Sequence, residues 1–307
     1  VRDAIPHIEE VAENLTEALK DEDLVSPFAG LGRFYEGQGL YTSAEVWRQQ
    51  CLSVVKMRFG SEHPNIAISL NNLAELYHSQ GRYSEAEPLY LEALELRKRL
   101  LGNEHPHVAT SLNNLAELYH SQGRYQEAEP LLIEALELRK RLLGLEHSQV
   151  ATSLSNLALL YYSQGRYSEA EPLYLEALAQ RKRLLREDHP DVATSLNNLA
   201  LLYYSQGRYS EAEPLYLETL ALRKRLLRED HPDVATSLNN LALLYYSQGR
   251  YSEAEPLFLK ALKLYERVLG VEHPHTVTIG KNLASLREKM AKNNSWLSRF
   301  TQRWRKS

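Results

Sequence analysis

The feature that most constrains this chain is a repeat with a period of 42 residues. A segment that begins RYSEAEPLYLE at Arg82 returns along most of the sequence with small changes. The glycine before it recurs every 42 residues, at Gly81, Gly123, Gly165, Gly207 and Gly249. A weaker copy of the repeat places a glycine at Gly39. A constant period of this size indicates a stacked array whose units bury their apolar faces only against neighbours. Such an array presents a long surface, so we expect a binding protein and not an enzyme.

The composition is that of a folded protein with no membrane span. Hydrophobic residues make up 43% and charged residues 25% of the 307 positions, which argues against wholesale disorder. No apolar run approaches the roughly 20 residues that a membrane-spanning helix needs. The lone Cys51 cannot form an internal disulfide, so we expect a reducing compartment and a cytoplasmic protein.

Charge is distributed unevenly along the chain, although the net charge is only −4. Residues 1–24 contain eight acidic and two basic residues, whereas residues 289–307 contain six basic residues and no acidic one. The repeats between these ends are close to neutral, so a basic stripe for nucleic acid is not expected. The sequence begins at Val1 and not at a methionine, and we therefore expect further domains before it.

The repeat that starts near Pro190 has the pattern of two amphipathic helices. Apolar residues recur at helical spacing from Pro190 to about Ser205, and a proline suits the first turn of a helix. Gly207 stands where a left-handed residue is needed to end this helix. Ser210 and Glu213 have the spacing of a capping box, which predicts the start of a second helix. The first helix of each repeat is called helix A below, and the second helix B.

Small residues distinguish between two architectures that fit a two-helix repeat. No window has the alternation of a β-strand, so the HEAT or armadillo class and the tetratricopeptide (TPR) class are left. Small and aromatic residues fall at the tetratricopeptide positions, where they let helices A and B approach closely, as at Ala200, Tyr203, Gly207, Ala212 and Tyr216. We therefore predict an all-α fold, a right-handed TPR superhelical solenoid of 42-residue helix-turn-helix repeats.

The predicted solenoid has six repeats and a cap at each end. An acidic amphipathic helix within residues 1–22 caps the first repeat, which is degenerate. A lone helix A over residues 275–291 caps the last repeat, and a basic aromatic tail follows over residues 292–307. The six repeats span residues 23–64, 65–106, 107–148, 149–190, 191–232 and 233–274.

The repeats resemble those of kinesin light chains. The resemblance covers about residues 61–290 and rests on the period and on segments such as HPDVATSLNNLALLYYSQGRYSEAEPLYLE. Near-identical tandem copies are also typical of light chain-like arrays in bacteria, especially cyanobacteria. The resemblance implies a non-enzymatic scaffold or adaptor that binds an extended peptide or partner segment in its concave groove. It does not extend to the heptad coiled coil that binds the motor heavy chain, so only the cargo-binding module carries over.

A second function is consistent with the start of the sequence. The segment DLVSPFAGLGRFYEGQGLYTSAE, residues 23–45, resembles what precedes such arrays in multidomain bacterial signalling NTPases. This resemblance implies that the array is a sensor or oligomerisation arm of a larger signalling NTPase. A nucleotide-binding domain upstream of Val1 would favour the arm, whereas a coiled coil there would favour the adaptor.

The stripe of helix A opposite the core is the predicted ligand surface, because helices A line the concave side in this architecture. The stripe carries one asparagine in each repeat after the first and one in the lone helix A, at Asn72, Asn114, Asn156, Asn198, Asn240 and Asn282. Glu75 and Glu117 give the groove an acidic entrance, and its middle is apolar, at Leu159, Leu201 and Leu243. An amide donates and accepts hydrogen bonds, which suits the backbone of an extended peptide. The light chain resemblance implies contact with the peptide for these asparagines and for an arginine late in helix B, namely Arg97, Arg139, Arg181 and Arg223.

Structural roles for the same residues are left open by the sequence. The asparagines either contact a ligand or bond the backbone of the neighbouring repeat. The leucines either line the groove or pack under adjacent helices. Arg97 and its equivalents either hold a peptide or lie at solvated helix ends, where the helix dipole favours them. In the sixth repeat Tyr265 replaces this arginine.

Other chemistry is not indicated. One histidine per repeat, from His63 to His273, precedes helix A, and a spacing of one repeat is too large for a shared metal ion. No catalytic motif is present, so we expect no metal, cofactor or enzymatic activity. In the tail, Trp296, Phe300 and Trp304 share one helical face among basic residues. This face fits packing on the last repeat or insertion into a partner or a groove, and we do not expect it to contact a membrane.

Overall fold

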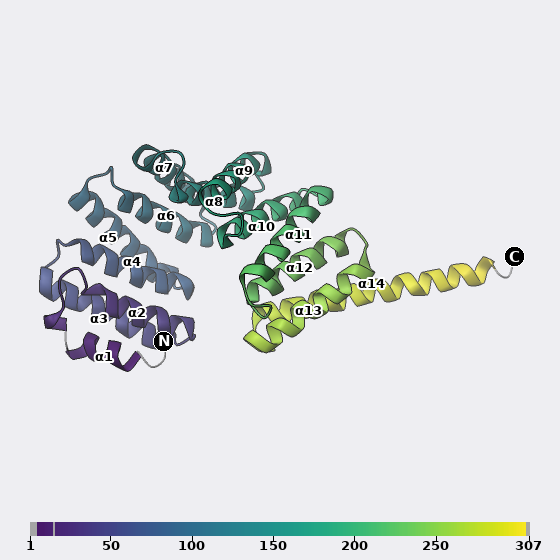
Figure 1. Ribbon diagram of the computed structural model, residues 1–307, viewed down its shortest axis with the longest axis horizontal. Coiled ribbons are helices and arrows are strands. Elements are labelled where there is room, and N and C mark those ends of the chain that lie inside the picture. The colour runs from purple at the N-terminus through teal and green to yellow at the C-terminus, as the bar shows by residue number, and fades with distance from the viewer. Residues whose placement is uncertain (1–4, 15, 305–307) are drawn as a thin grey trace. The chain divides into compact units, whose positions relative to one another are not determined.

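Helices form all the regular secondary structure of the described residues. The computed structural model describes the backbone of residues 5–14 and 16–304, and the side chains of these residues up to Lys292 except that of Glu13. Within these ranges the chain forms fourteen α-helices, one 3-10 turn and no strand (Figure 1). The prediction of an all-α chain built from successive helix pairs is confirmed.

Two compact units divide the chain, residues 1–160 and 161–307. The first unit begins with α1 (Ile5–Asn14) and the 3-10 turn η2 (Thr16–Ala18). Three packed pairs follow: α2 (Val25–Gly37) with α3 (Tyr41–Phe59), α4 (Pro64–Ser79) with α5 (Tyr83–Leu101), and α6 (Pro106–Ser121) with α7 (Tyr125–Leu143). The boundary between the units falls within α8 (Ser148–Ser163).

The second unit repeats the same pairing. It contains α9 (Tyr167–Leu184), the pair α10 (Pro190–Ser205) and α11 (Tyr209–Leu226), the pair α12 (Pro232–Ser247) and α13 (Tyr251–Leu269), and α14 (Pro274–Trp304). Small residues lie where helices A and B meet, as predicted: Ala200 and Ala212 are fully buried. The buried hydroxyl of Thr219 donates to the carbonyl of Leu215 at 2.8 Å, which satisfies its hydrogen-bonding group.

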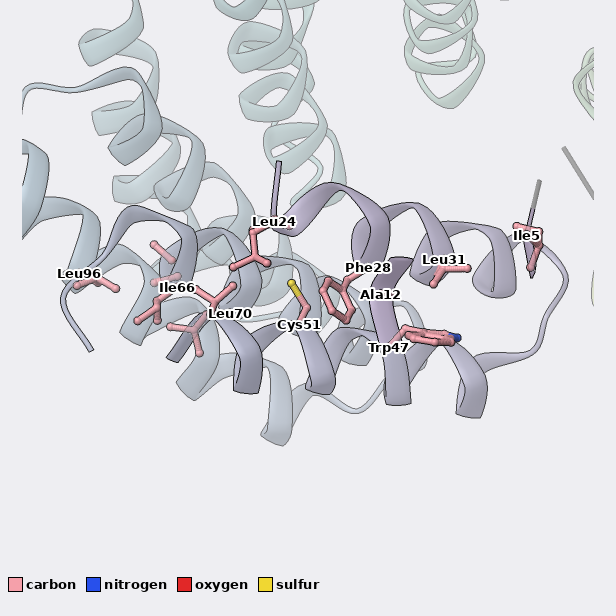
Figure 2. Packing of buried hydrophobic residues seen from close by; sticks show 14 residues of the cluster. Ile5, Ala12, Leu24, Phe28, Leu31, Trp47, Cys51, Ile66, Leu70 and Leu96 are labelled. Atoms are coloured by element: carbon pink, nitrogen blue, oxygen red, sulfur yellow. The ribbon is translucent and has the colours of Figure 1, made fainter. Parts of the chain in front are cut away.

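Helix α1 covers the first helix pair. Ile5 and Ala12 on α1 are buried in one cluster with Phe28 and Leu31 of α2 and Trp47 of α3 (Figure 2). Leu15, which also belongs to the amphipathic helix predicted within residues 1–22, lies outside the described residues. Burial of this stripe removes the apolar edge that the first repeat would otherwise expose.

Polar contacts tether the same segment. Arg58 on α3 donates to the backbone carbonyls of Thr16 and Leu19 at 3.0 and 2.8 Å. The same guanidinium lies 2.6 Å from the carboxylate of Asp21. Arg58 therefore holds the turn between α1 and α2 against the end of α3.

Most of the A helices begin with a histidine and a proline that act together. Pro190 occupies the first turn of α10, and the Nδ1 atom of His189 accepts a hydrogen bond from the backbone N–H of Asp191 at 3.1 Å. This bond satisfies one of the backbone donors that a helix leaves free at its start. The same bond recurs at His63, His105, His147, His231 and His273. The interpretation of these histidines as residues of the helix start is confirmed.

Glycine ends helix A, as predicted. Gly207 has a φ of +74°, and the backbone N–H of the next residue, Arg208, donates to the carbonyl of Tyr203 at 2.9 Å. Residues with a side chain rarely adopt this left-handed conformation. The turn between helices A and B therefore requires glycine.

The capping box predicted at the start of helix B is wrong. The N-cap residue of α11 is Arg208 and not Ser210, and no side chain caps this helix. Ser210 lies inside the first turn. The carboxylate of Glu213 accepts hydrogen bonds from Arg250 of the next repeat at 2.8 and 2.9 Å. A charged partner in the next repeat thus replaces the local contact that the spacing suggested.

Helix α14 is longer than the predicted lone helix. It runs without a break from Pro274 to Trp304, packs against α13, and buries Ile279, Leu283 and Leu286. The side chains of Trp296, Phe300 and Trp304 lie outside the described residues, so the role of this aromatic face stays a prediction.

Candidate functional site

The predicted stripe lies on the side of the A helices that faces away from the core. We call this side the A-helix face and define it by Asn72, Glu75 and Ser79 and their equivalents in later repeats. Glu75 and Ser79 are exposed, and the asparagines are half-buried in each repeat. The stripe is therefore accessible along the A helices, and it is bordered by two series of hydrogen bonds between successive repeats.

Asparagine side chains form the first series. In the first unit the amide of Asn114 donates to Oδ1 of Asn71, and that of Asn156 donates to Oδ1 of Asn113, both at 2.9 Å. In the second unit the matching bonds measure 3.0 Å from Asn240 to Asn197 and 3.4 Å from Asn282 to Asn239. The partner is a side chain of the preceding repeat and not its backbone.

The two remaining asparagines sit at the same position of their helices. Asn72 on α4 and Asn198 on α10 are both half-buried. The backbone carbonyl of Asn72 accepts a hydrogen bond from Arg48 of the first repeat at 2.7 Å. Arg48, which stands where most later repeats have an aromatic residue, is itself buried and paired with Glu36 at 2.6 Å.

Serine hydroxyl groups form the second series of hydrogen bonds. Its residues follow the asparagines of the first series by three residues or more along each helix A. In the first unit Nε2 of His78 lies 2.9 Å from Oγ of Ser121. In the second unit a tyrosine takes the place of the histidine, with O–O distances of 2.9 to 3.2 Å, in the pairs Tyr162–Ser205, Tyr204–Ser247 and Tyr246–Ser285. Sequence reasoning missed this series, because its partners are 39 or 43 residues apart.

The predicted leucines lie between the two series. Leu159 exposes 39% of its surface, and Leu201 and Leu243 are half-buried. In the first unit Leu159 and Asn156 line a hollow of about 100 Å³. Its other lining residues come from α6 and α7, at Ala116, Glu117, His120, Ser121 and Leu132. Leu159 therefore does not pack under an adjacent helix but lines an open depression.

The two glutamates of the A-helix face, Glu75 and Glu117, belong to the first unit. Burial lowers the pKa of His120, although Glu117 acts in the opposite direction. Burial also raises the pKa of Tyr90 on α5, and the charges of Glu75 and Glu117 add to this effect. The carboxylates of two successive repeats thus both disfavour ionisation of the Tyr90 hydroxyl.

The predicted arginines are not exposed on this face. Arg97, Arg139, Arg181 and Arg223 are all buried. Each donates to a serine hydroxyl on the following helix A, and the donor–acceptor distances are 2.7 to 3.0 Å, in the pairs Arg97–Ser111, Arg139–Ser153, Arg181–Ser195 and Arg223–Ser237. The alternative of a solvated helix end is wrong for these four residues. Arg99, two residues after Arg97, is exposed and does lie at a solvated helix end.

Burial without a carboxylate partner changes the pKa of these arginines. Desolvation lowers the pKa of each guanidinium. In three of the four, a backbone carbonyl of the following repeat accepts a second bond at 3.2 to 3.3 Å, at His107, Gln149 and Asp233. The arginines thus fasten one repeat to the next.

A second arginine, in the turn after helix A, forms an ion cluster. Arg124 lies 4.0 Å from the ring centre of Tyr119 and 2.7 Å from the carboxylates of both Glu127 and Glu87. Glu87 belongs to the preceding repeat. The same arrangement recurs around Arg82, Arg208 and Arg250. The recurring segment with the pattern R-Y-x-E-A-E contains the arginine and both glutamates, but the glutamate of the preceding repeat lies 37 positions from its arginine.

Among residues 5–14 and 16–304, no group of three or more histidine, cysteine, aspartate or glutamate residues could hold a metal ion. Within the same residues, no helix is both long and apolar enough to cross a membrane.

Comparisons with known proteins agree with this geometry. The family described as Tetratricopeptide repeat matches residues 23–99, 80–141, 107–183, 149–225, 191–267 and 233–295. BtubC (BKLC) from P. vanneervenii is 28% identical with a TM-score of 0.61, over 73% of this chain and 88% of that one. A kinesin light chain-type protein of Podospora anserina with nearly identical TPR-like repeats is 30% identical with a TM-score of 0.57, over 67% of this chain and 98% of that one. A Rap protein in complex with competence and sporulation factor shares the fold at 18% identity and a TM-score of 0.60, over 93% and 80% of the two chains. No curated protein sequence matches the chain.

Proposed function

Since the chain belongs to the tetratricopeptide repeat family, we propose that its A-helix face holds an extended peptide or partner segment. The predicted TPR fold and the resemblance to kinesin light chain-like repeats are confirmed. Both indicate a scaffold for protein–protein interaction. The peptide and its position on the A helices are our proposal.

The observation that carries this proposal is the hollow beside Leu159. An exposed leucine in a depression of about 100 Å³ offers an apolar contact to a ligand side chain. Asn156 lies at the same hollow. A pocket with an apolar wall beside a backbone-binding group is a combination with which an extended peptide is recognised.

The asparagines have hydrogen-bonding capacity left for a ligand. Asn156 uses one amide proton in its bond to Asn113. A primary amide has a second proton and an acceptor oxygen. The bond to Asn113 fixes the orientation of the amide, which lowers the entropy that binding would cost. We propose that Asn114, Asn240 and Asn282 contribute in the same way, and that Asn72 and Asn198 contribute from the same position of their helices.

For the arginines we propose an indirect role. A peptide that contacted Arg139 would have to replace its 2.7 Å bond to Ser153 inside the protein. Arg97, Arg139, Arg181 and Arg223 would instead support the face by fixing each helix A against the preceding helix B. A cytoplasmic location, further domains before Val1 and the alternative role as an arm of a signalling NTPase stay predictions from the sequence.

A matched pair of charge insertions tests the proposed site. Leu159→Lys places a charge in the hollow, whereas Ile133→Lys places the same charge on helix α7, where the side chain is equally exposed at 41%. We expect Leu159→Lys to reduce the capture of peptides from a random peptide array about tenfold, since an apolar contact of roughly 1 to 2 kcal/mol is lost. Ile133→Lys should bind as the unsubstituted chain does. Equal capture by both folded variants would contradict a site at Leu159.

A further inference from the structure

We propose that the segment bound at the hollow is cationic and places lysine or arginine side chains against Glu117 and Glu75. This inference rests on the proposed function and specifies the class of peptide that the first unit selects. It follows from the charges of the A-helix face and from the partners that each charged group has.

Glu75 and Glu117 differ from most carboxylates of the repeats in having no cationic partner. Glu87 and Glu127 are held at 2.7 Å by Arg124, and Glu45 and Glu85 are held in the same way by Arg82. Both exposed carboxylates of the A-helix face lie outside these clusters. Within the described part of the first unit, no lysine, arginine or histidine lies within ion-pair distance of either one.

The neighbouring basic groups do not neutralise these two carboxylates. Burial lowers the pKa of His120, which disfavours the cationic form of this imidazole. His78 uses its Nε2 atom in the bond to Ser121. Arg33 is exposed, and it occupies the position equivalent to Glu75 on α2 of the first repeat, before the stretch from α4 to α8. Arg48 is buried in its pair with Glu36. The face from α4 to α8 is consequently negative.

The hollow joins this negative charge to an apolar wall. Glu117 lines it on one side, and Leu159 lines it on the other. The butylene stem of a lysine or the propylene stem of an arginine would lie against Leu159 while its charged end reaches Glu117. A second basic residue would meet Glu75 in the repeat before. An acidic segment would instead bring like charges together at the same place.

The test compares capture of synthetic peptides by the full chain and by two charge variants. The peptides contain two arginines at increasing spacing and one leucine, and matched sets replace both arginines by glutamine or by glutamate. The first variant is Glu75→Gln/Glu117→Gln. The control is Glu95→Gln/Glu134→Gln, which removes the same charge from exposed positions on α5 and α7.

We expect the full chain to bind arginine peptides in preference to both matched sets, with weaker binding at high salt. The Glu75→Gln/Glu117→Gln variant should lose about three- to tenfold of this affinity, as expected for two solvent-exposed ion pairs. The control should stay within about twofold. Equal capture of arginine and glutamate peptides, or an unchanged preference in the first variant, would overturn the cationic assignment and leave the site intact. If the Leu159→Lys variant captured the arginine peptides as well as the unsubstituted chain does, the proposed site itself would be overturned.

Discussion

At the scale of single residues, the buried arginines of helix B fix one repeat to the next. The guanidinium of Arg181 donates to Oγ of Ser195 at 2.7 Å, and desolvation lowers its pKa. The last interface lacks this bond, because Tyr265, whose hydroxyl lies 2.6 Å from Oγ1 of Thr236, replaces the arginine and the buried Ile279 replaces the serine. The arginine is therefore replaceable, provided that its acceptor is replaced together with it.

Removal of the acceptor alone should cost more than removal of both groups. Ser195→Ala leaves a buried charged donor without its hydroxyl partner, so we expect the free energy of unfolding to fall by about 1 to 3 kcal/mol. Arg181→Met/Ser195→Ala removes donor and acceptor together and should lie closer to the unsubstituted chain. Urea denaturation followed by circular dichroism measures both. Ser210→Ala is the control and should change stability by less than about 0.5 kcal/mol, since this serine caps no helix. A double variant less stable than Ser195→Ala would refute this account.

At the scale of helices, glycine has opposite effects in a turn and inside a helix. Gly207 has a φ of +74°, and a Cβ atom built on it would meet no atom within 4 Å. Gly30 lies within α2, and there too a Cβ atom would meet nothing within 4 Å. Steric contact is therefore the same at both positions, and only the backbone conformation differs.

Alanine substitution separates these two effects. Gly207→Ala forces a side chain into the left-handed region, so we expect a loss of about 1 to 2 kcal/mol in unfolding free energy. Gly30→Ala should raise it by about 0.5 to 1 kcal/mol, because alanine loses less entropy in a helix. Thermal and urea denaturation of the two variants test the prediction. A destabilising Gly30→Ala would show that α2 does not tolerate the added methyl group.

Helix B shows a natural instance of the same rule. Gly102 ends α5 with a φ of +80°, whereas Arg186 stands at the equivalent position after α9. There the helix ends one residue earlier, and Leu185 is extended with a φ of −111°. The sequence change thus alters the turn instead of forcing arginine into a left-handed conformation.

What the sequence could predict depended on the distance between partners. The bounds of α10, the glycine turn and the histidine at the helix start follow from neighbouring residues, and all three predictions are confirmed. The asparagine pairs, the buried Arg139–Ser153 bond and the clusters around Arg124 join different helices. Their geometry depends on the register in which repeats stack, and a periodic sequence does not specify that register. The hollow at Leu159 escaped prediction for the same reason.

At the scale of the whole chain, the ion clusters recur in both units. Hydrogen bonds from arginine lower the pKa of the glutamate three residues later, at Glu85, Glu127, Glu169, Glu211 and Glu253. The ionised form of each is therefore more stable in the folded chain than in the unfolded one. A carboxyl with a lowered pKa contributes stability at pH values above its unfolded pKa, near 4.3, and loses this contribution as the pH falls through the folded pKa.

This linkage predicts an acid-sensitive array whose sensitivity depends on the turn arginines. We expect Tm to be nearly constant from about pH 7 to pH 5 and to fall below about pH 4, and Arg208→Gln/Arg250→Gln should flatten this fall. The matched control is Arg186→Gln/Arg228→Gln, which removes the same charge from side chains that are 90% and 89% exposed. High salt should weaken the clusters and reduce the difference between the unsubstituted chain and the first variant. Differential scanning calorimetry from pH 7 to pH 3 measures all three proteins. If the Arg208→Gln/Arg250→Gln curve ran parallel to that of the unsubstituted chain, the clusters would not be the source of the acid sensitivity.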